Sequence, residues 1–171
     1  KFMGYPGSAY LKIAEGCNNR CRYCAIPLIR GDLKSRTVSD IMGEFNDLIA
    51  RGMKEINLIA QDVGSFGKDR GGGEIAELLE AVSRVSGDFW VRLLYIHPDR
   101  FPKDILPVLR SDTRILSYFD LPFQHASQKV LRRMGRTGSA GAYLDLIAEI
   151  RSTLEDAVIR STFMVGFTGE G

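Results

Sequence analysis

The amino-acid sequence predicts an α/β protein: a partial (β/α) TIM-like barrel with parallel strands and about five β/α units. Apolar runs of strand length alternate along the chain with longer segments of helical period. Polar side chains suited to chemistry follow directly after several of these runs, as in barrels whose sites lie at the carboxyl ends of the strands. The 171 residues are too few for a full barrel of eight units, which needs about 250.

The first half of the chain is expected to hold two strands and two helices. A strand over residues 10–14 (YLKIA) precedes a cysteine-rich loop and a helix over about residues 39–51, which Gly52 ends. A strand over residues 55–60 leads through a glycine-rich loop into a helix over about residues 74–85. The first helix is predicted because its apolar residues share one face: Ile41, Phe45, Leu48 and Ile49.

The second half continues the alternation. His97-Pro98 and Pro122 each follow a strand, and Pro102 lies near the first turn of a short helix. The expected order is strand, short helix, strand, two helices and strand, over residues 89–96, about 104–109, 115–121, about 127–134, about 140–154 and 158–165. Strands separated by helices should be parallel and joined by right-handed crossovers, in a barrel or in an open doubly wound sheet.

The composition indicates a cytoplasmic globular protein. A net charge of +2 does not by itself indicate a nucleic-acid partner. No apolar run approaches the ~20 residues that span a bilayer, and the first residues lack the pattern of a secretory signal. Because position 1 is not methionine and the chain stops abruptly at GFTGEG, we expect residues 1–171 to be one domain of a longer protein.

All three cysteines lie in the stretch GCNNRCRYC, as Cys17, Cys21 and Cys24. A zinc site would need a fourth ligand, for which only His97 or His125 offers a soft donor. A catalytic disulfide would leave one cysteine over. An iron–sulfur cluster normally takes four cysteines, and three would leave one iron of a four-iron cube open to a small molecule.

The pattern C-x-x-x-C-x-aromatic-C, with Tyr23 as the aromatic residue, resembles the signature of radical S-adenosylmethionine (SAM) enzymes. The resemblance implies a barrel of the radical SAM type and a 4Fe–4S cluster on Cys17, Cys21 and Cys24. It also implies that the amino and carboxylate groups of SAM bind the open iron, with Tyr23 beside the adenine. Reductive cleavage of SAM would then yield methionine and a 5′-deoxyadenosyl radical.

The longer stretch YLKIAEGCNNRCRYCAIPLIRGDLKSR resembles the methylthiotransferases, and the resemblance runs through most of the chain. Four further segments favour the RimO type, which modifies the β-carbon of an aspartate in a small-subunit ribosomal protein: residues 60–67, 94–99, 118–125 and 134–137. The alternatives are the branch that modifies a tRNA adenosine and a non-catalytic iron–sulfur or zinc-binding module. Two departures from the family pattern are Arg22, where the family has Ser or Thr, and Thr168, where it has Pro.

The resemblance implies further parts outside this chain. Family members carry an N-terminal domain with a second 4Fe–4S cluster and a C-terminal RNA-binding-like domain. We therefore expect the isolated core not to complete methylthiolation. The implied partners are the ribosomal protein and an electron donor such as flavodoxin or ferredoxin, whereas nucleic acid would be contacted only through a missing domain or the ribosome.

Other residues are predicted to contact the cofactor. Gln61 and Asp62 occupy the end of the second strand, where many radical SAM enzymes hold the methionine amine, so they are better candidates than the loop Gly71–Gly73 before Glu74. Gln124 follows the fourth strand as a polar contact, and Gly166 follows the fifth, where a glycine permits close approach of backbone to adenine.

The histidines and one group of basic residues each have two interpretations. His97 and His125 are either structural or in contact with substrate. Four basic residues at helical spacing form either a solvated face or a contact for an acidic or RNA-rich partner: Lys129, Arg132, Arg133 and Arg136. Arg136, beside Gly135, is also predicted to point into the site.

Overall fold

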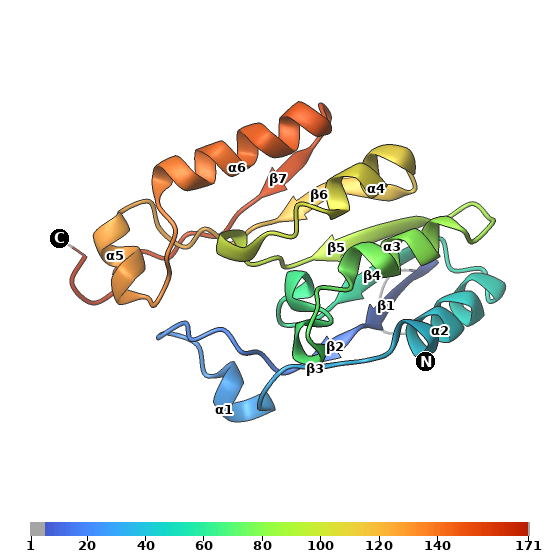
Figure 1. Ribbon diagram of the computed structural model, residues 1–171, viewed down its shortest axis with the longest axis horizontal. Coiled ribbons are helices and arrows are strands. Elements are labelled where there is room, and N and C mark those ends of the chain that lie inside the picture. The colour runs from blue at the N-terminus through green and yellow to red at the C-terminus, as the bar shows by residue number, and fades with distance from the viewer. Residues whose placement is uncertain (1–5, 171) are drawn as a thin grey trace.

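Five parallel strands form one sheet in a computed structural model that describes residues 6–170 (Figure 1). Lys1–Tyr5 and Gly171, both inside the predicted domain, lie outside the described residues. The strands are β1 (Ser8–Lys12), β4 (Glu55–Ile59), β5 (Trp90–Leu94), β6 (Ile115–Asp120) and β7 (Val158–Arg160). Their order across the sheet, β1-β4-β5-β6-β7, is their order in the chain. A doubly wound sheet would reverse this order at a switch point, so the winding is that of the predicted partial barrel.

Four helices cover one face of this sheet. They are α2 (Val38–Ala50), α3 (Ile75–Ser83), α4 (Ile105–Ser111) and α6 (Ala140–Thr153). Each packs against the next one along the chain, which makes a single layer (Figure 1). Leu11 of β1 and Leu93 of β5 are completely buried in the core, and the rings of Phe45 and Phe89 meet edge to face at 5.3 Å.

The other face of the sheet is polar. Tyr10, Asn57 and Arg92 are aligned across β1, β4 and β5 by the strand register. Arg92 donates to the carboxylate of Glu55 at 2.9 Å and lies over the ring of Tyr118 at 4.7 Å. Such a face is typical of a barrel interior, because side chains alternate between the two faces of a strand.

The last strand is shorter than predicted. β7 ends at Arg160 rather than at residue 165, and beyond it, within the described residues, a single isolated bridge joins Phe163 to Gln124. The neighbouring strand β6 ends at Asp120, two residues before Pro122, which has no backbone N–H to donate. Leu121 N still donates to Arg160 O at 2.9 Å, but Phe123 N donates to the side chain of Ser161 at 3.2 Å, so the ladder is interrupted after Leu121.

Several short elements were not predicted. β2 (Ala14–Glu15) pairs antiparallel with β3 (Lys34–Ser35), and α1 (Ile26–Arg30) lies between them. The short helix expected over about residues 127–134 is present as α5 (Gln128–Arg133), before α6. The elements that were not predicted also include three 3-10 turns, η1 (Val63–Ser65), η2 (Lys68–Arg70) and η3 (Pro98–Arg100), which order the loops that follow β4 and β5. These elements are too short to generate a recognisable periodicity. None of the helices in residues 6–170 has the length and apolar character needed to cross a membrane.

Candidate active site at the carboxyl ends of the strands

A pocket of about 380 Å³ opens where the first three strands of the sheet end. The loop that follows β2 supplies all three cysteines and Tyr23 to its lining. The ends of β4 and β5 supply the rest of the polar wall, namely Gln61, Tyr95 and His97. Five of the predicted site residues therefore meet in one place: Cys17, Tyr23, Cys21, Cys24 and Gln61.

The cysteine loop is held in place by backbone contacts. Gly16 has φ +71°, and a Cβ atom there would lie 2.0 Å from the carbonyl oxygen of Asp32, so only glycine fits. Cys17 N donates to Gly31 O at 3.1 Å, and Cys24 N donates to Cys21 O at 3.1 Å. The chain thus turns twice within the loop, which brings the three thiols to the same pocket.

The thiols are free and half-buried. Burial raises the pKa of Cys17, whose Sγ accepts a hydrogen bond from Asn19 N at 3.4 Å. Residues 6–170 contain no group of three His, Cys, Asp or Glu side chains already gathered as metal ligands. The donor set nevertheless fits an iron–sulfur cluster, because three soft sulfur ligands line one pocket.

Asp62 connects three parts of the site but does not line the pocket. Its carboxylate is 2% exposed and accepts hydrogen bonds from Asn19 Nδ2 at 2.9 Å, Ser65 Oγ at 2.6 Å and His97 N at 3.1 Å. These donors come from the cysteine loop, η1 and the end of β5. Asp62 was predicted to contact the cofactor, but its carboxylate already accepts three hydrogen bonds from the protein.

Gln61, one residue earlier, has the opposite character. Its side chain lines the pocket, and its Oε1 is buried without a hydrogen-bond partner in the described residues. A buried carbonyl oxygen left unpaired costs about 1–3 kcal/mol. Gln61 is therefore suited to accept a hydrogen bond from a ligand.

The end of β5 places two further residues at the pocket. Tyr95 has φ +70°, a rare conformation for a residue other than glycine, and its side chain lines the pocket. His97 is 6% exposed, with Nε2 at 3.8 Å from Cys21 Sγ. Burial, together with the nearby positive charge of Arg136, lowers the pKa of His97 to about 4. Tyr95 was not predicted as a site residue, although it lies within residues 94–99, one of the segments that resemble the RimO type.

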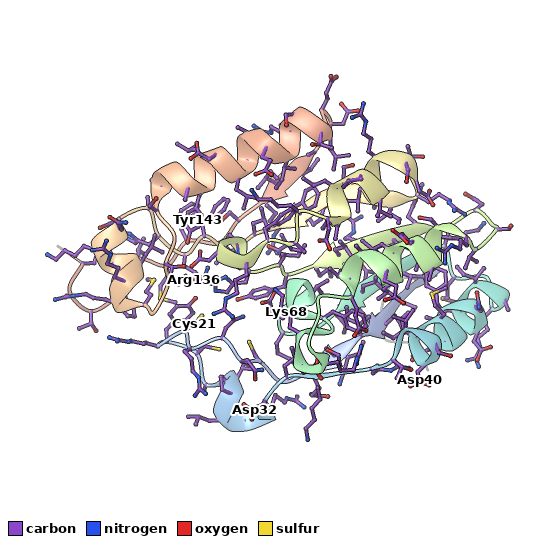
Figure 2. All side chains as sticks on the ribbon, viewed as in Figure 1. Cys21, Asp32, Asp40, Lys68, Arg136 and Tyr143 are labelled. Atoms are coloured by element: carbon purple, nitrogen blue, oxygen red, sulfur yellow. The ribbon has the colours of Figure 1, made fainter. Side chains whose placement is uncertain are left out.

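Arg136 is a buried cation behind Tyr23. It is 2% exposed; Nε donates to Tyr23 Oη at 3.0 Å, and Nη1 donates to Pro122 O at 2.8 Å. Its Nη2 has no partner among the described residues, in which Arg136 also forms no ion pair. Figure 2 shows Arg136 between Cys21 and Tyr143, at the end of the sheet where the pocket lies.

In the structure, the predicted basic stripe does not include Arg136. Lys129, Arg132 and Arg133 are exposed, but Arg136 has left their face because α5 ends at Arg133 and Gly135 turns the chain with φ +76°. This turn directs Arg136 into the protein interior, where it contacts Tyr23 but does not itself line the pocket.

Gln124, Gly166 and His125 do not line this pocket. Gln124 is 6% exposed and has φ +70°. Gly166 is exposed, and a Cβ atom there would meet nothing within 4 Å. His125 Nε2 lies 3.1 Å from Glu170 Oε1, and Glu170 Oε2 accepts from Gly166 N at 2.7 Å. His125 and Gly166 therefore both contact the carboxylate of Glu170.

The family of the chain follows from sequence comparison. The family model described as "Radical SAM superfamily" matches residues 11–171. The chain therefore belongs to that superfamily, whose members use a 4Fe–4S cluster and SAM.

Within the superfamily, the chain is similar to proteins named ribosomal protein uS12 methylthiotransferase RimO. It is 45% identical to the one from Treponema denticola over 99% of this chain and 40% of the relative. It is 48% identical to the one from Moorella thermoacetica over 95% of this chain and 38% of the relative. These similarities confirm the predicted resemblance to the RimO type. The chain spans about two fifths of the length of these curated relatives.

Solved structures share the fold. The radical SAM methyltransferase TsrM from Kitasatospora setae, with tryptophan substrate and aza-SAM bound, matches with a TM-score of 0.68 at 15% identity, over 92% of this chain and 30% of that one. The cobalamin-dependent radical enzyme OxsB matches with a TM-score of 0.71 at 14% identity, over 92% of this chain and 24% of that one. At such identities the match supports the α/β radical SAM fold alone.

Proposed function

We propose that this chain is the SAM-cleaving core of a methylthiotransferase that modifies the β-carbon of an aspartate in ribosomal protein uS12. The observation that carries the proposal is the convergence of Cys17, Cys21 and Cys24 on one pocket at the carboxyl ends of the strands, in a chain 45% identical to a RimO protein over 99% of its length. Residues 1–171 would form one domain of a longer enzyme.

Cys17, Cys21 and Cys24 would hold a 4Fe–4S cluster as thiolates. When bound, the cluster supplies the electron that cleaves SAM to methionine and a 5′-deoxyadenosyl radical. The protein's part is to bind and orient SAM and to keep water away from the reacting carbon. The pocket suits this part because its lining is mainly apolar, with a few polar atoms at defined positions.

The unpaired polar atoms of the site complement the methionine end of SAM. Gln61 Oε1 is a free acceptor for the ammonium group, and Arg136 Nη2 is a free donor for the carboxylate. Tyr23, which accepts a hydrogen bond from Arg136 Nε, lines the pocket and would lie against the adenine. Asp62 would act indirectly, by holding Asn19 and the backbone of His97 in position. Gln124 and Gly166 would contact SAM only from the adjoining loops after β6 and β7.

The relatives favour a protein substrate over the anticodon region of tRNA, because those described above all carry the uS12 name. A ribosomal substrate would place the enzyme in the cytoplasm, with flavodoxin or ferredoxin as electron donor. The second 4Fe–4S cluster and the RNA-binding-like domain would belong to the rest of the longer protein.

The test is anaerobic. The chain is reconstituted with iron and sulfide, reduced, supplied with SAM and assayed for 5′-deoxyadenosine. Cys17→Ala, Cys21→Ala and Cys24→Ala should each abolish the product, whereas Asp40→Asn, an exposed change on α2, should leave it unchanged. A chain that holds zinc and no iron, or a cluster that survives loss of any one of these cysteines, would refute the proposal in favour of a non-catalytic metal module.

A further inference from the structure

His97 faces one of the three cysteines at hydrogen-bonding distance for sulfur. Its Nε2 lies 3.8 Å from Cys21 Sγ, and its side chain is 6% exposed. Nothing in the cysteine motif itself requires a histidine here, because the two residues are 76 positions apart and come from different strand ends. Only the fold brings them together.

The backbone of His97 is held on both sides. His97 N donates to Asp62 Oδ1 at 3.1 Å, and the same carboxylate binds Asn19 of the cysteine loop through Oδ2 at 2.9 Å. Pro98 follows at once and begins η3, which restricts the backbone on the other side. The carboxylate of Asp62 therefore holds both the backbone that carries the ring and the cysteine loop.

The proton of the ring can be assigned from its neighbours. Once Cys21 is a thiolate it can only accept, so Nε2 must carry hydrogen. Nδ1 has no partner among the described residues, which gives no reason for the proton to lie there.

We propose that His97 is a positioning residue that donates an Nε2–H···Sγ hydrogen bond to the Cys21 thiolate and thereby raises the reduction potential of the cluster held there. The proposal rests on the proposed function, in which Cys21 is a cluster ligand. Reduction adds negative charge to the cluster and its sulfur ligands, and a hydrogen bond to a ligand sulfur stabilises that charge. His97 thus favours the reduced state from which SAM is cleaved.

The experiment is a redox titration of the reconstituted chain followed by electron paramagnetic resonance. Asn at position 97 places its amide near Nδ1, whereas Gln places its amide near Nε2. In His97→Asn we expect the ratio of reduced to oxidised cluster at a fixed solution potential to fall about three- to tenfold. His97→Gln should restore most of that ratio, and the control His125→Asn should not change it.

Equal midpoint potentials in wild type, His97→Asn and His97→Gln, each with a full cluster, would overturn the proposal while leaving the proposed function intact. Failure of the wild-type chain to form a four-iron cluster would overturn both.

A second measurement covers the case in which the variants at position 97 do not fold. The chain has two histidines, so His125→Asn grown with ¹⁵N-histidine carries a single labelled imidazole. Pulsed resonance on its reduced cluster should detect ¹⁵N coupling through the hydrogen bond. Absence of that coupling would refute the contact.

Discussion

At the scale of single residues, the site is marked by buried polar atoms that have no hydrogen-bond partner within residues 6–170. Burying a guanidinium without a carboxylate partner is costly, and Arg136 Nη2 has no hydrogen-bond partner in the described residues either. Arg136 also anchors Tyr23 and the backbone at Pro122, so its position is well determined. A bound anion would repay the cost of burying this charge.

Arg136→Gln should therefore weaken SAM binding. We expect the Kd for SAM to rise at least about tenfold, because a hydrogen bond to a charged group contributes about 1.5–3 kcal/mol. Calorimetric titration of the reconstituted chain measures it, with the exposed Arg132→Gln on α5 as the matched control. Unchanged affinity in a folded Arg136→Gln chain would show that the carboxylate binds elsewhere.

Two glycines should respond in opposite ways to alanine. At Gly16 a Cβ atom would lie 2.0 Å from backbone and φ is +71°, so Gly16→Ala should lower the free energy of unfolding by at least about 2 kcal/mol and distort the cysteine loop. Gly43 lies in α2 with nothing within 4 Å of a Cβ atom, so Gly43→Ala should raise it by about 0.5–1 kcal/mol. Urea unfolding measures both, and two changes of the same sign would contradict the geometry.

At the scale of elements, one carboxylate joins η3 to the loop between α5 and α6. Asp99 accepts from Thr137 N at 2.8 Å, Gly138 N at 3.2 Å and Tyr143 Oη at 2.8 Å. Burial opposes the charge, but the hydrogen bonds from Thr137 and Tyr143 outweigh it and hold the pKa of Asp99 below its usual value. The loop that carries Arg136 is thereby fixed to the end of β5.

Asp99→Asn should lower the free energy of unfolding by about 1–2 kcal/mol at pH 7, since the carboxylate is only half-buried. A carboxyl group whose folded pKa is depressed stabilises the fold above its unfolded pKa and loses that effect as pH falls through the folded value. The difference between wild type and variant should thus shrink below about pH 4. Denaturant unfolding at several pH values measures this, with the exposed Asp145→Asn as control. A difference independent of pH would show that the charge is not responsible.

At the scale of the whole molecule, the chain has the radical SAM fold, with a polar face on its sheet and a pocket at the carboxyl ends of the strands. Because it spans about two fifths of the RimO relatives, we propose that the sulfur to be inserted is held elsewhere in the longer enzyme.

The reconstituted chain should therefore release 5′-deoxyadenosine yet form no methylthiolated product from uS12. Mass spectrometry of uS12 or of a peptide around its target aspartate would detect the added methylthio group. Addition of the missing part of a RimO relative is the matched comparison. Product formed by this chain unaided would refute the division of labour.

The sequence by itself determined the local and periodic features of this protein. The alternation of apolar runs identified five strands and their main helices, and the resemblance carried by Cys17, Cys21, Tyr23 and Cys24 identified the radical SAM superfamily, because neither depends on distant contacts. Tertiary structure decided what distant segments do to one another. Arg136 points away from the exposed basic residues of α5 because Gly135 turns the chain, and β7 is shorter than its apolar pattern predicted. Asp62 became an internal anchor and His97 a neighbour of Cys21 only when separate strand ends met at one edge of the sheet. Periodicity records which residues are buried, but not which buried polar atoms meet.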